Sequence, residues 1–213
     1  MGHVLLIASL SAAFLESWKD GDLGILVHSA YPYYSRTRHR GARAECDWVQ
    51  DLTEAVKAGD PRATRVAAQC LATHPRLAGF RGTVIPAPRS SSSRPGLIGL
   101  AEELVSAGVG QRAANLVRRE VPVGSSRMRR RQGLGGVSVE QHAESMGVSG
   151  EIPDGPILIV DDVFTTGGTI QAVALKLRQA GHTGPICGAT VSWVSSDPSQ
   201  MSDCPQKYAT RRI

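Results

Sequence analysis

One stretch constrains this chain more than any other part of the sequence. Four aliphatic residues, 157–160, are followed at once by Asp161 and Asp162 and then by a loop of threonine and glycine. A short aliphatic run is typical of a strand that is buried on both faces of a parallel sheet. From Gly168 the apolar residues recur at helical spacing, and Gly181 supplies the signal that ends a helix. The stretch therefore predicts a strand that ends at residue 160, a short loop, and a helix from residue 168.

The predicted loop has the composition of a phosphate-binding site. Backbone N–H groups at a helix N-terminus point toward a bound anion, and the helix dipole favours its charge. Glycine lets the backbone come close to the anion, and threonine hydroxyls add donors. We therefore predict that the phosphate group of a ligand binds to this loop, through Thr165, Thr166, Gly167, Gly168 and Thr169.

The two carboxylates that precede the loop predict the rest of the ligand. Asp161 and Asp162 cannot bind phosphate directly, because like charges repel. Carboxylates suit the vicinal hydroxyls of a sugar, or Mg2+ held through water. The sequence contains neither GxxxxGK[ST] nor GxGxxG, so the common nucleotide-binding loops are excluded. The combination indicates a phosphorylated sugar with a metal, against the alternative of an ordinary turn between strand and helix.

Residues 156–170 resemble the 5-phosphoribosyl-1-diphosphate (PRPP) signature of the type I phosphoribosyltransferases, in which four hydrophobic residues and two acids precede a Thr/Gly loop that enters a helix. We expect one α/β domain over residues 1–213, with a mainly parallel twisted sheet, helices on both faces, and the ligand at the carboxyl ends of the strands. The resemblance implies that Asp161 and Asp162 bind the ribose hydroxyls and Mg2+, and that the loop 165–169 binds the 5-phosphate. It also implies transfer of the phosphoribosyl group to a nitrogenous acceptor with release of pyrophosphate.

A second strand, loop and helix repeat this arrangement earlier in the chain. Residues 83–88 read as a buried strand that two prolines end, and residues 97–107 read as a helix. The loop between them is rich in serine and carries a cation at each end. In the family that the chain resembles, the corresponding loop holds pyrophosphate. The resemblance therefore assigns pyrophosphate to Arg89, Ser90, Ser91 and Arg94, whereas composition alone also allows a flexible serine linker.

Residues 120–150 have no apolar periodicity, and the segment contains six glycines. A run of this length without regular structure inside a compact domain is commonly an active-site lid. The family has such a mobile loop over the pyrophosphate at this place in the order. We therefore predict a flexible lid whose cations bind pyrophosphate, namely Arg127, Arg129, Arg130 and Arg131. A solvated arginine patch that binds nucleic acid is the alternative.

Other segments give weaker predictions. Residues 1–43 read as an N-terminal appendage, and residues 29–40, rich in tyrosine and arginine, read either as a solvated loop or as a surface that stacks a base. Residues 114–118 predict a short strand. Trp193, at the end of a strand predicted over 185–193, is a weak candidate for contact with the acceptor, and a core tryptophan is as good an interpretation. Residues 195–213 read as a polar, basic tail.

The order of parts resembles one branch of the family, the ComF-like proteins associated with competence. The resemblance rests on Lys57-Ala-Gly-Asp60, on Gln132, and on residues 137–148. The chain departs from the branch because the N-terminal zinc-binding cysteines are missing and because His142 and Ser145 stand where the branch has Arg and Asn. This resemblance adds two alternatives to an enzyme: a PRPP-sensing regulator without turnover, and a DNA-associated binding protein of the competence type.

Charge and cysteine content limit the partners and the compartment. The formal net charge of +5 suits an anionic ligand or, less specifically, nucleic acid. The four cysteines form no CxxC pair, so we expect a reducing cytoplasm and no zinc ribbon. The apolar run at residues 4–15 is too short to span a bilayer, so no membrane partner is expected. PRPP and an unidentified acceptor are the expected ligands, and a homodimer stays open.

Overall fold

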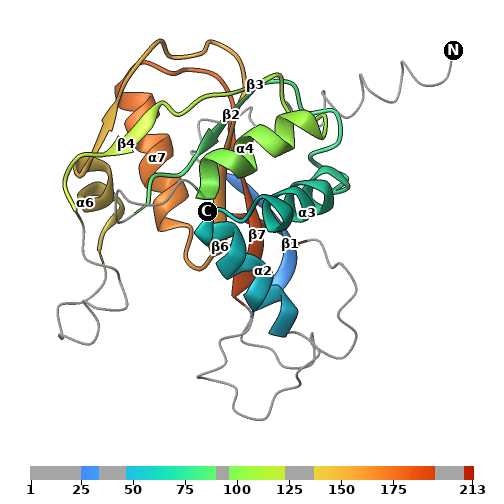
Figure 1. Ribbon diagram of the computed structural model, residues 1–213. Helices are drawn as coiled ribbons and strands as arrows, with labels where there is room; N and C mark the ends of the chain where they lie inside the picture. Colours follow the sequence, from blue (N-terminus) through green and yellow to red (C-terminus); the bar gives the residue numbers. More distant parts are fainter. Residues whose placement is uncertain (1–24, 34–46, 90–95, 123–136, 195–208) are drawn as a thin grey trace, which may run out of the picture.

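A computed structural model describes residues 25–33, 47–89, 96–122, 137–194 and 209–213 of the chain (Figure 1). Along these residues the elements follow one another as β1 (Leu26–Tyr33), α2 (Asp47–Ala58), α3 (Pro61–Ala72), β2 (Thr83–Pro86), α4 (Gly96–Ser106), β3 (Arg112–Ala113), β4 (Val117–Arg119), α6 (Val139–Glu144), β5 (Met146–Val148), β6 (Ile157–Phe164), α7 (Gly168–Gln179), β7 (Ile186–Val194) and β8 (Ala209–Arg212).

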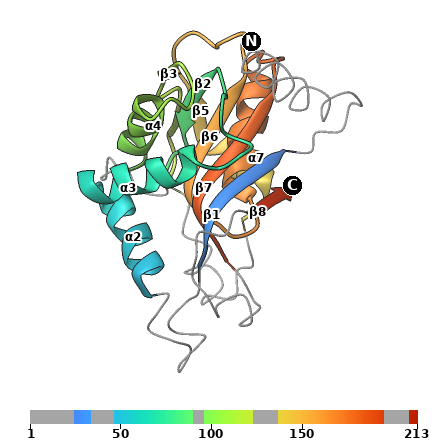
Figure 2. The same ribbon diagram turned by 90° about the vertical axis from the view of Figure 1, so that its right-hand side faces the viewer.

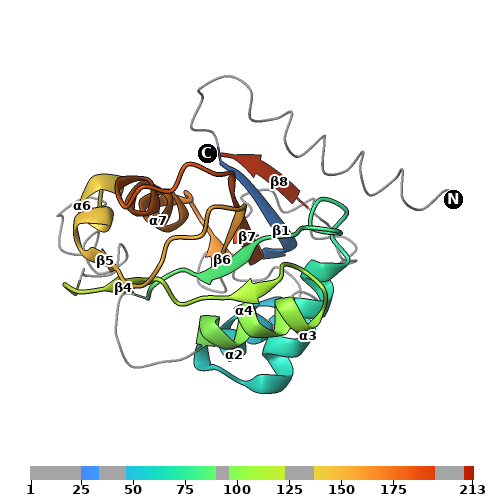
Figure 3. The same cartoon turned by 90° about the horizontal axis from the view of Figure 1, so that it is seen from above.

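The main sheet has six strands in the order β3-β2-β6-β7-β1-β8. All neighbouring pairs are parallel except β1 and the edge strand β8. Helices α2, α3 and α4 cover one face, and α7 covers the other (Figures 2 and 3). This is the predicted α/β fold with a mainly parallel sheet and helices on both faces. A small antiparallel pair, β4 and β5, stands apart from the main sheet.

The centre of the sheet is the aliphatic run that the sequence identified. Residues 157–160 of β6 and residues 83–86 of β2 are buried, as are the residues of β7 apart from the last. Strands with helices on both faces must be apolar on both sides, which explains the unbroken aliphatic runs. β6 lies between β2 and β7, so the acids that follow the run are placed in the middle of the sheet.

Local signals explain where the helices begin and end. Asp60 caps α3 by accepting a hydrogen bond from the backbone N–H of Ala63, and Pro61 occupies the first helical position. α7 begins after Gly167, whose φ is +78°, and the chain leaves it through Gly181, whose φ is +98°. Glycine adopts this left-handed conformation without the steric cost that other residues meet. The predicted helix from residue 168 is confirmed.

Several predictions about the elements are wrong. β6 does not end at residue 160 but continues to Phe164, because backbone pairing with β7 persists through residues 161–164. Residues 25–33 are not an appendage, since they form β1 inside the main sheet. Residues 29–33 are therefore not a solvated loop, and Tyr31 is buried with its hydroxyl donating to Cys70 Sγ over 2.7 Å.

Residues 112–150 also differ from the prediction. The short strand predicted over 114–118 lies instead at 112–113 and at 117–119. The expectation of no regular structure over 120–150 is wrong for its described end. Ser138 and Gln141 form a reciprocal capping box at the start of α6, and β5 pairs with β4. Closure of this segment over a ligand stays a prediction.

Candidate functional site

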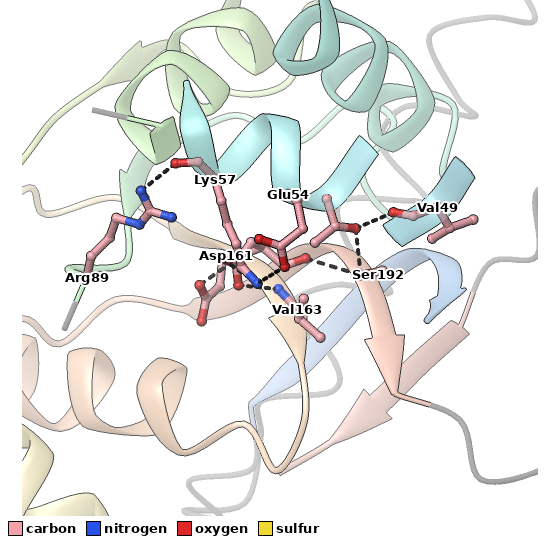
Figure 4. Close-up of polar contacts among 9 residues, drawn as sticks. Val49, Glu54, Lys57, Arg89, Asp161, Val163 and Ser192 are labelled. Carbon is pink, nitrogen blue, oxygen red and sulfur yellow. Dashed lines mark hydrogen bonds and ion pairs between the residues drawn. The ribbon is translucent and has the colours of Figure 1, made fainter. Parts of the chain in front are cut away.

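Asp161 and Asp162 lie on the last half of β6, at the carboxyl end of the sheet (Figure 4). Each carboxylate accepts a hydrogen bond from the next backbone N–H in the chain. Asp162 N donates to Asp161 Oδ1 over 2.9 Å, and Val163 N donates to Asp162 Oδ1 over 2.6 Å. These bonds fix one oxygen of each carboxylate and leave the second oxygen of each, Oδ2, for another partner.

The environment of Asp161 disfavours its negative charge. Burial, and then the neighbouring Asp162 carboxylate, raise the pKa of Asp161 well above its ordinary value. The backbone N–H of Asp162 and the Lys57 ammonium act in the opposite direction but do not cancel the rise. Two adjacent carboxylates in a partly enclosed position need cations or hydroxyl donors, which is what a sugar and a metal would supply.

Lys57 forms an ion pair with Asp162, and the sequence interpretation gave it no role. It lies in the last turn of α2, and its Nζ is 3.6 Å from Asp162 Oδ2 and 3.1 Å from Glu54 Oε1. Lys57 and Asp162 are 105 positions apart in the sequence, so no local pattern could reveal their contact. The only sequence signal was its place in the Lys57–Asp60 segment that resembles the ComF-like branch.

Arg89 connects α2 to the end of β2. Its Nη1 donates to the backbone carbonyl of Lys57, and its own carbonyl accepts a hydrogen bond from Arg119 Nε over 2.9 Å. The Arg89 guanidinium therefore binds a helix carbonyl, and its assignment to pyrophosphate stays a prediction. Ser90, Ser91 and Arg94 lie outside the described residues, so their assignment to pyrophosphate stays a prediction.

Arg119 joins this network from β4. Besides the carbonyl of Arg89, it donates through Nη1 to Ser145 Oγ, which in turn donates to the carbonyl of His142 over 2.6 Å. Burial lowers the pKa of Arg119, and Asp161 partly offsets the effect because its negative charge favours the guanidinium. The sequence interpretation gave Arg119 no role, because its partners Arg89 and Ser145 are distant in the sequence.

The segment that was predicted to be a lid is thus anchored at its described end. Ser145 lies just after α6 and is bound to Arg119, and burial together with Arg119 lowers the pKa of His142. The four lid arginines, Arg127, Arg129, Arg130 and Arg131, lie outside the described residues. Their contact with pyrophosphate stays a prediction.

The predicted phosphate loop turns from β6 into α7. Thr165 and Thr166 are exposed, and no side chain caps the first turn of α7, so its N–H groups are not taken up by a capping side chain. Gly167 is enclosed on the opposite side. A Cβ built on Gly167 would lie 2.5 Å from Ile213 Cδ1 and 3.1 Å from Phe164 Cε2. This glycine is needed for its φ of +78° and for the close approach of residue 213.

Trp193 lies on β7, paired with Phe164 of β6. The indole is 4% exposed, and its Nε1 has no hydrogen-bond partner among the described residues. The burial agrees with a core tryptophan, and an unsatisfied indole N–H is unusual in a core. Contact between Trp193 and an acceptor stays a prediction.

The donor set at the acids fits a weakly held divalent cation. Within the described ranges no cluster of three or more His, Cys, Asp or Glu side chains could hold a metal ion. Mg2+ commonly binds through one or two carboxylates and takes its remaining ligands from water and substrate phosphates. Asp161 and Asp162 suffice for that mode of binding.

No helix among the described residues is long and apolar enough to cross a membrane.

Comparison of the sequence with protein-family models gives no match, and comparison with curated proteins gives none either. The fold is similar to the crystal structure of orotate phosphoribosyltransferase from Aeropyrum pernix, with 19% identity and a TM-score of 0.32. The similarity covers 83% of this chain and 76% of that chain. What the site does must therefore be inferred from its own side chains.

Proposed function

We propose that the protein transfers the 5-phosphoribosyl group of PRPP to a nitrogenous acceptor with Mg2+ and releases pyrophosphate. One observation carries the proposal. Two adjacent carboxylates, each with one oxygen that accepts no backbone hydrogen bond, lie shortly before a helix N-terminus whose first turn lacks a side-chain cap, with cations on the neighbouring elements. Carboxylates, backbone donors and cations match the hydroxyls, the 5-phosphate and the pyrophosphate of one ligand.

Each part of the site has a role in this proposal. Asp161 and Asp162 accept hydrogen bonds from the ribose hydroxyls and orient the sugar. The N–H groups at the start of α7, with the hydroxyls of Thr165, Thr166 and Thr169, bind the 5-phosphate. The arginines 89 and 119 provide positive charge beside the departing pyrophosphate.

The reaction needs no nucleophile from the protein. The bond between C1 of the ribose and the pyrophosphate oxygen breaks, and its electron pair stays with pyrophosphate. The lone pair of the acceptor nitrogen forms the new bond to C1, and the nitrogen loses its proton to solvent. The carboxylates and the loop hold C1 in line with both groups. When bound to Asp161 and Asp162, Mg2+ would neutralise charge on pyrophosphate.

The finer assignment to the ComF-like branch rests on its sequence resemblance. Residues 137–148 form α6 and β5, and Ser145, which stands where the branch has Asn, binds Arg119. Gln132 and the arginine cluster lie outside the described residues. A PRPP sensor without turnover and a DNA-associated protein are therefore outcomes that the test below must separate from an enzyme.

Calorimetry with PRPP and with ribose 5-phosphate tests the proposal in the wild type and in Asp161→Asn and Asp162→Asn. Loss of a hydrogen bond to a charged group costs about 1.5–3 kcal/mol, so PRPP affinity should fall roughly ten- to hundredfold. Thermal stability should hold, because an amide oxygen can still accept the backbone N–H bond. Asp154→Asn, in the exposed turn before β6, is the matched control. Equal affinity in all four proteins would refute the assignment of the acids.

A further inference from the structure

Lys57 has a contact that the proposed reaction does not yet explain. Its ammonium lies 3.6 Å from Asp162 Oδ2, which is longer than its 3.1 Å contact with Glu54 Oε1. The Lys57 side chain is 25% exposed, whereas Asp162 is 17% exposed and Glu54 is 55% exposed. The ammonium is therefore partly exposed and lies between the Glu54 and Asp162 carboxylates (Figure 4).

The backbone beneath this ammonium is held on two sides. One helical turn earlier, the buried Thr53 hydroxyl donates to Val49 O over 2.7 Å and lies 3.2 Å from Ser192 Oγ on β7. On the other side, Arg89 donates to the Lys57 carbonyl. The last turn of α2 is thus fixed over the acids, while the four-carbon stem of the lysine keeps its rotational freedom.

The contact with Lys57 involves the oxygen of Asp162 that a metal ion would also need. Its Oδ1 accepts the N–H of Val163, so Oδ2 is the oxygen available to a cation, and Lys57 lies against it. The positive charge of Lys57 also acts on Asp161. A divalent cation that binds these acids would meet the ammonium at close range, and two cations at one carboxylate oxygen repel each other.

We propose that Lys57 and a divalent cation compete for Asp162, and that the displaced ammonium binds the pyrophosphate group of the substrate. The second step rests on the proposed function. An ammonium on a flexible stem binds phosphate oxygens as a point charge, without a fixed geometry. Pyrophosphate held by the metal would lie within the same small region as Asp162. Lys57 thus neutralises negative charge of the two acids before the ligand arrives, and it binds the leaving group afterwards.

A permanent ion pair that only fastens α2 to β6 is the other interpretation, and it makes different predictions. If Lys57 only fastened α2 to β6, its removal would lower the stability of the protein. The metal affinity of the acids would then be unchanged or weaker. A competing lysine would have the opposite effect on the metal. Its removal would strengthen the binding of a divalent cation alone and weaken the binding of pyrophosphate.

The test uses the full chain with Lys57→Met, which keeps the stem length, and Lys57→Arg, which keeps the charge. Binding of Mn2+ alone is measured by electron paramagnetic resonance, and binding of inorganic pyrophosphate and of PRPP is measured by calorimetry at saturating Mg2+. Lys57→Met should bind Mn2+ more tightly by on the order of tenfold and both phosphate ligands more weakly by on the order of tenfold. Lys57→Arg should stay near the wild type in both. Glu54→Gln is the matched control, and it should not tighten Mn2+ binding.

The outcomes separate this inference from the proposed function. Unchanged or weaker Mn2+ binding by a folded Lys57→Met protein overturns the competition. Unchanged pyrophosphate and PRPP binding by that variant, beside a wild type that binds both, overturns the role of Lys57 at the leaving group. A wild type that binds no PRPP refutes the proposed function and the second step with it, while the Mn2+ measurement still decides the first.

Discussion

Replacement of Gly167 by alanine tests whether the structure explains the shape of the phosphate loop. Gly167 has a φ of +78°, and a Cβ there would lie 2.5 Å from Ile213 Cδ1. The left-handed conformation costs a non-glycine residue roughly 1–2 kcal/mol. Forcing an extra methyl group into a packed site costs about 1–3 kcal/mol. Ile213 Cδ1 is the end of a flexible side chain and can move, so we expect Gly167→Ala to lose about 2–3 kcal/mol of unfolding free energy.

Two further variants separate these contributions. Gly108 has a φ of +86° with no atom within 4 Å of a built Cβ, so Gly108→Ala reports the conformational cost alone. Ile213→Ala removes the side chain that Gly167→Ala would meet, so the double variant should recover the packing cost but not the conformational one. Urea unfolding of each variant gives the free energies. If Gly167→Ala costs no more than Gly108→Ala, the contact between Gly167 and Ile213 does not matter and this reasoning is wrong.

Three other predictions concern stability, anchoring and the acceptor. Burial, then His74 and Arg76, lower the pKa of His28 to about 3. The unfolded state then takes up a proton that the folded state does not, so stability should fall by about 1.4 kcal/mol per pH unit below about pH 6.5; His28→Asn should flatten this slope in urea unfolding, and an unchanged slope would contradict the assignment. Ser145→Ala should cost about 1.5 kcal/mol in the same assay, because Arg119 loses a charged hydrogen bond; a loss below 0.5 kcal/mol, the usual range for surface sites, would show that the bond is unimportant. Candidate bases should quench tryptophan fluorescence in the presence of PRPP, and a full quench in Trp193→Phe would exclude Trp193 as the reporter.

The sequence predicted the elements whose determinants are local. The buried aliphatic run, the acids, the small-residue loop and the helix from residue 168 all depend on neighbours within about one turn or one strand. The start of α3 at Pro61 was readable for the same reason, since Asp60 caps it. The capping box Ser138–Gln141 was equally local, and its serine-to-glutamine spacing could have predicted α6.

The parts that sequence could not predict depend on contacts between distant segments. Lys57 meets Asp162 because α2 packs against the sheet, where Thr53 contacts Ser192 of β7. β1 was missed because the tyrosine and arginine content of residues 29–40 indicated a solvated loop or a stacking surface. In the structure Pro32 lies in β1 opposite Trp193 of β7, beyond the residues 26–29 that pair with β8.

The central claim is transfer of the phosphoribosyl group, and release of pyrophosphate measures it most directly. The protein is incubated with PRPP and Mg2+, with and without a panel of nitrogenous bases, beside Asp161→Asn and Asp162→Asn as blanks. We expect pyrophosphate release by the wild type that depends on one of the bases and is lost in both variants. Binding of PRPP without release by any base would identify a sensor and contradict the claim, as would release that is equal in the wild type and the variants.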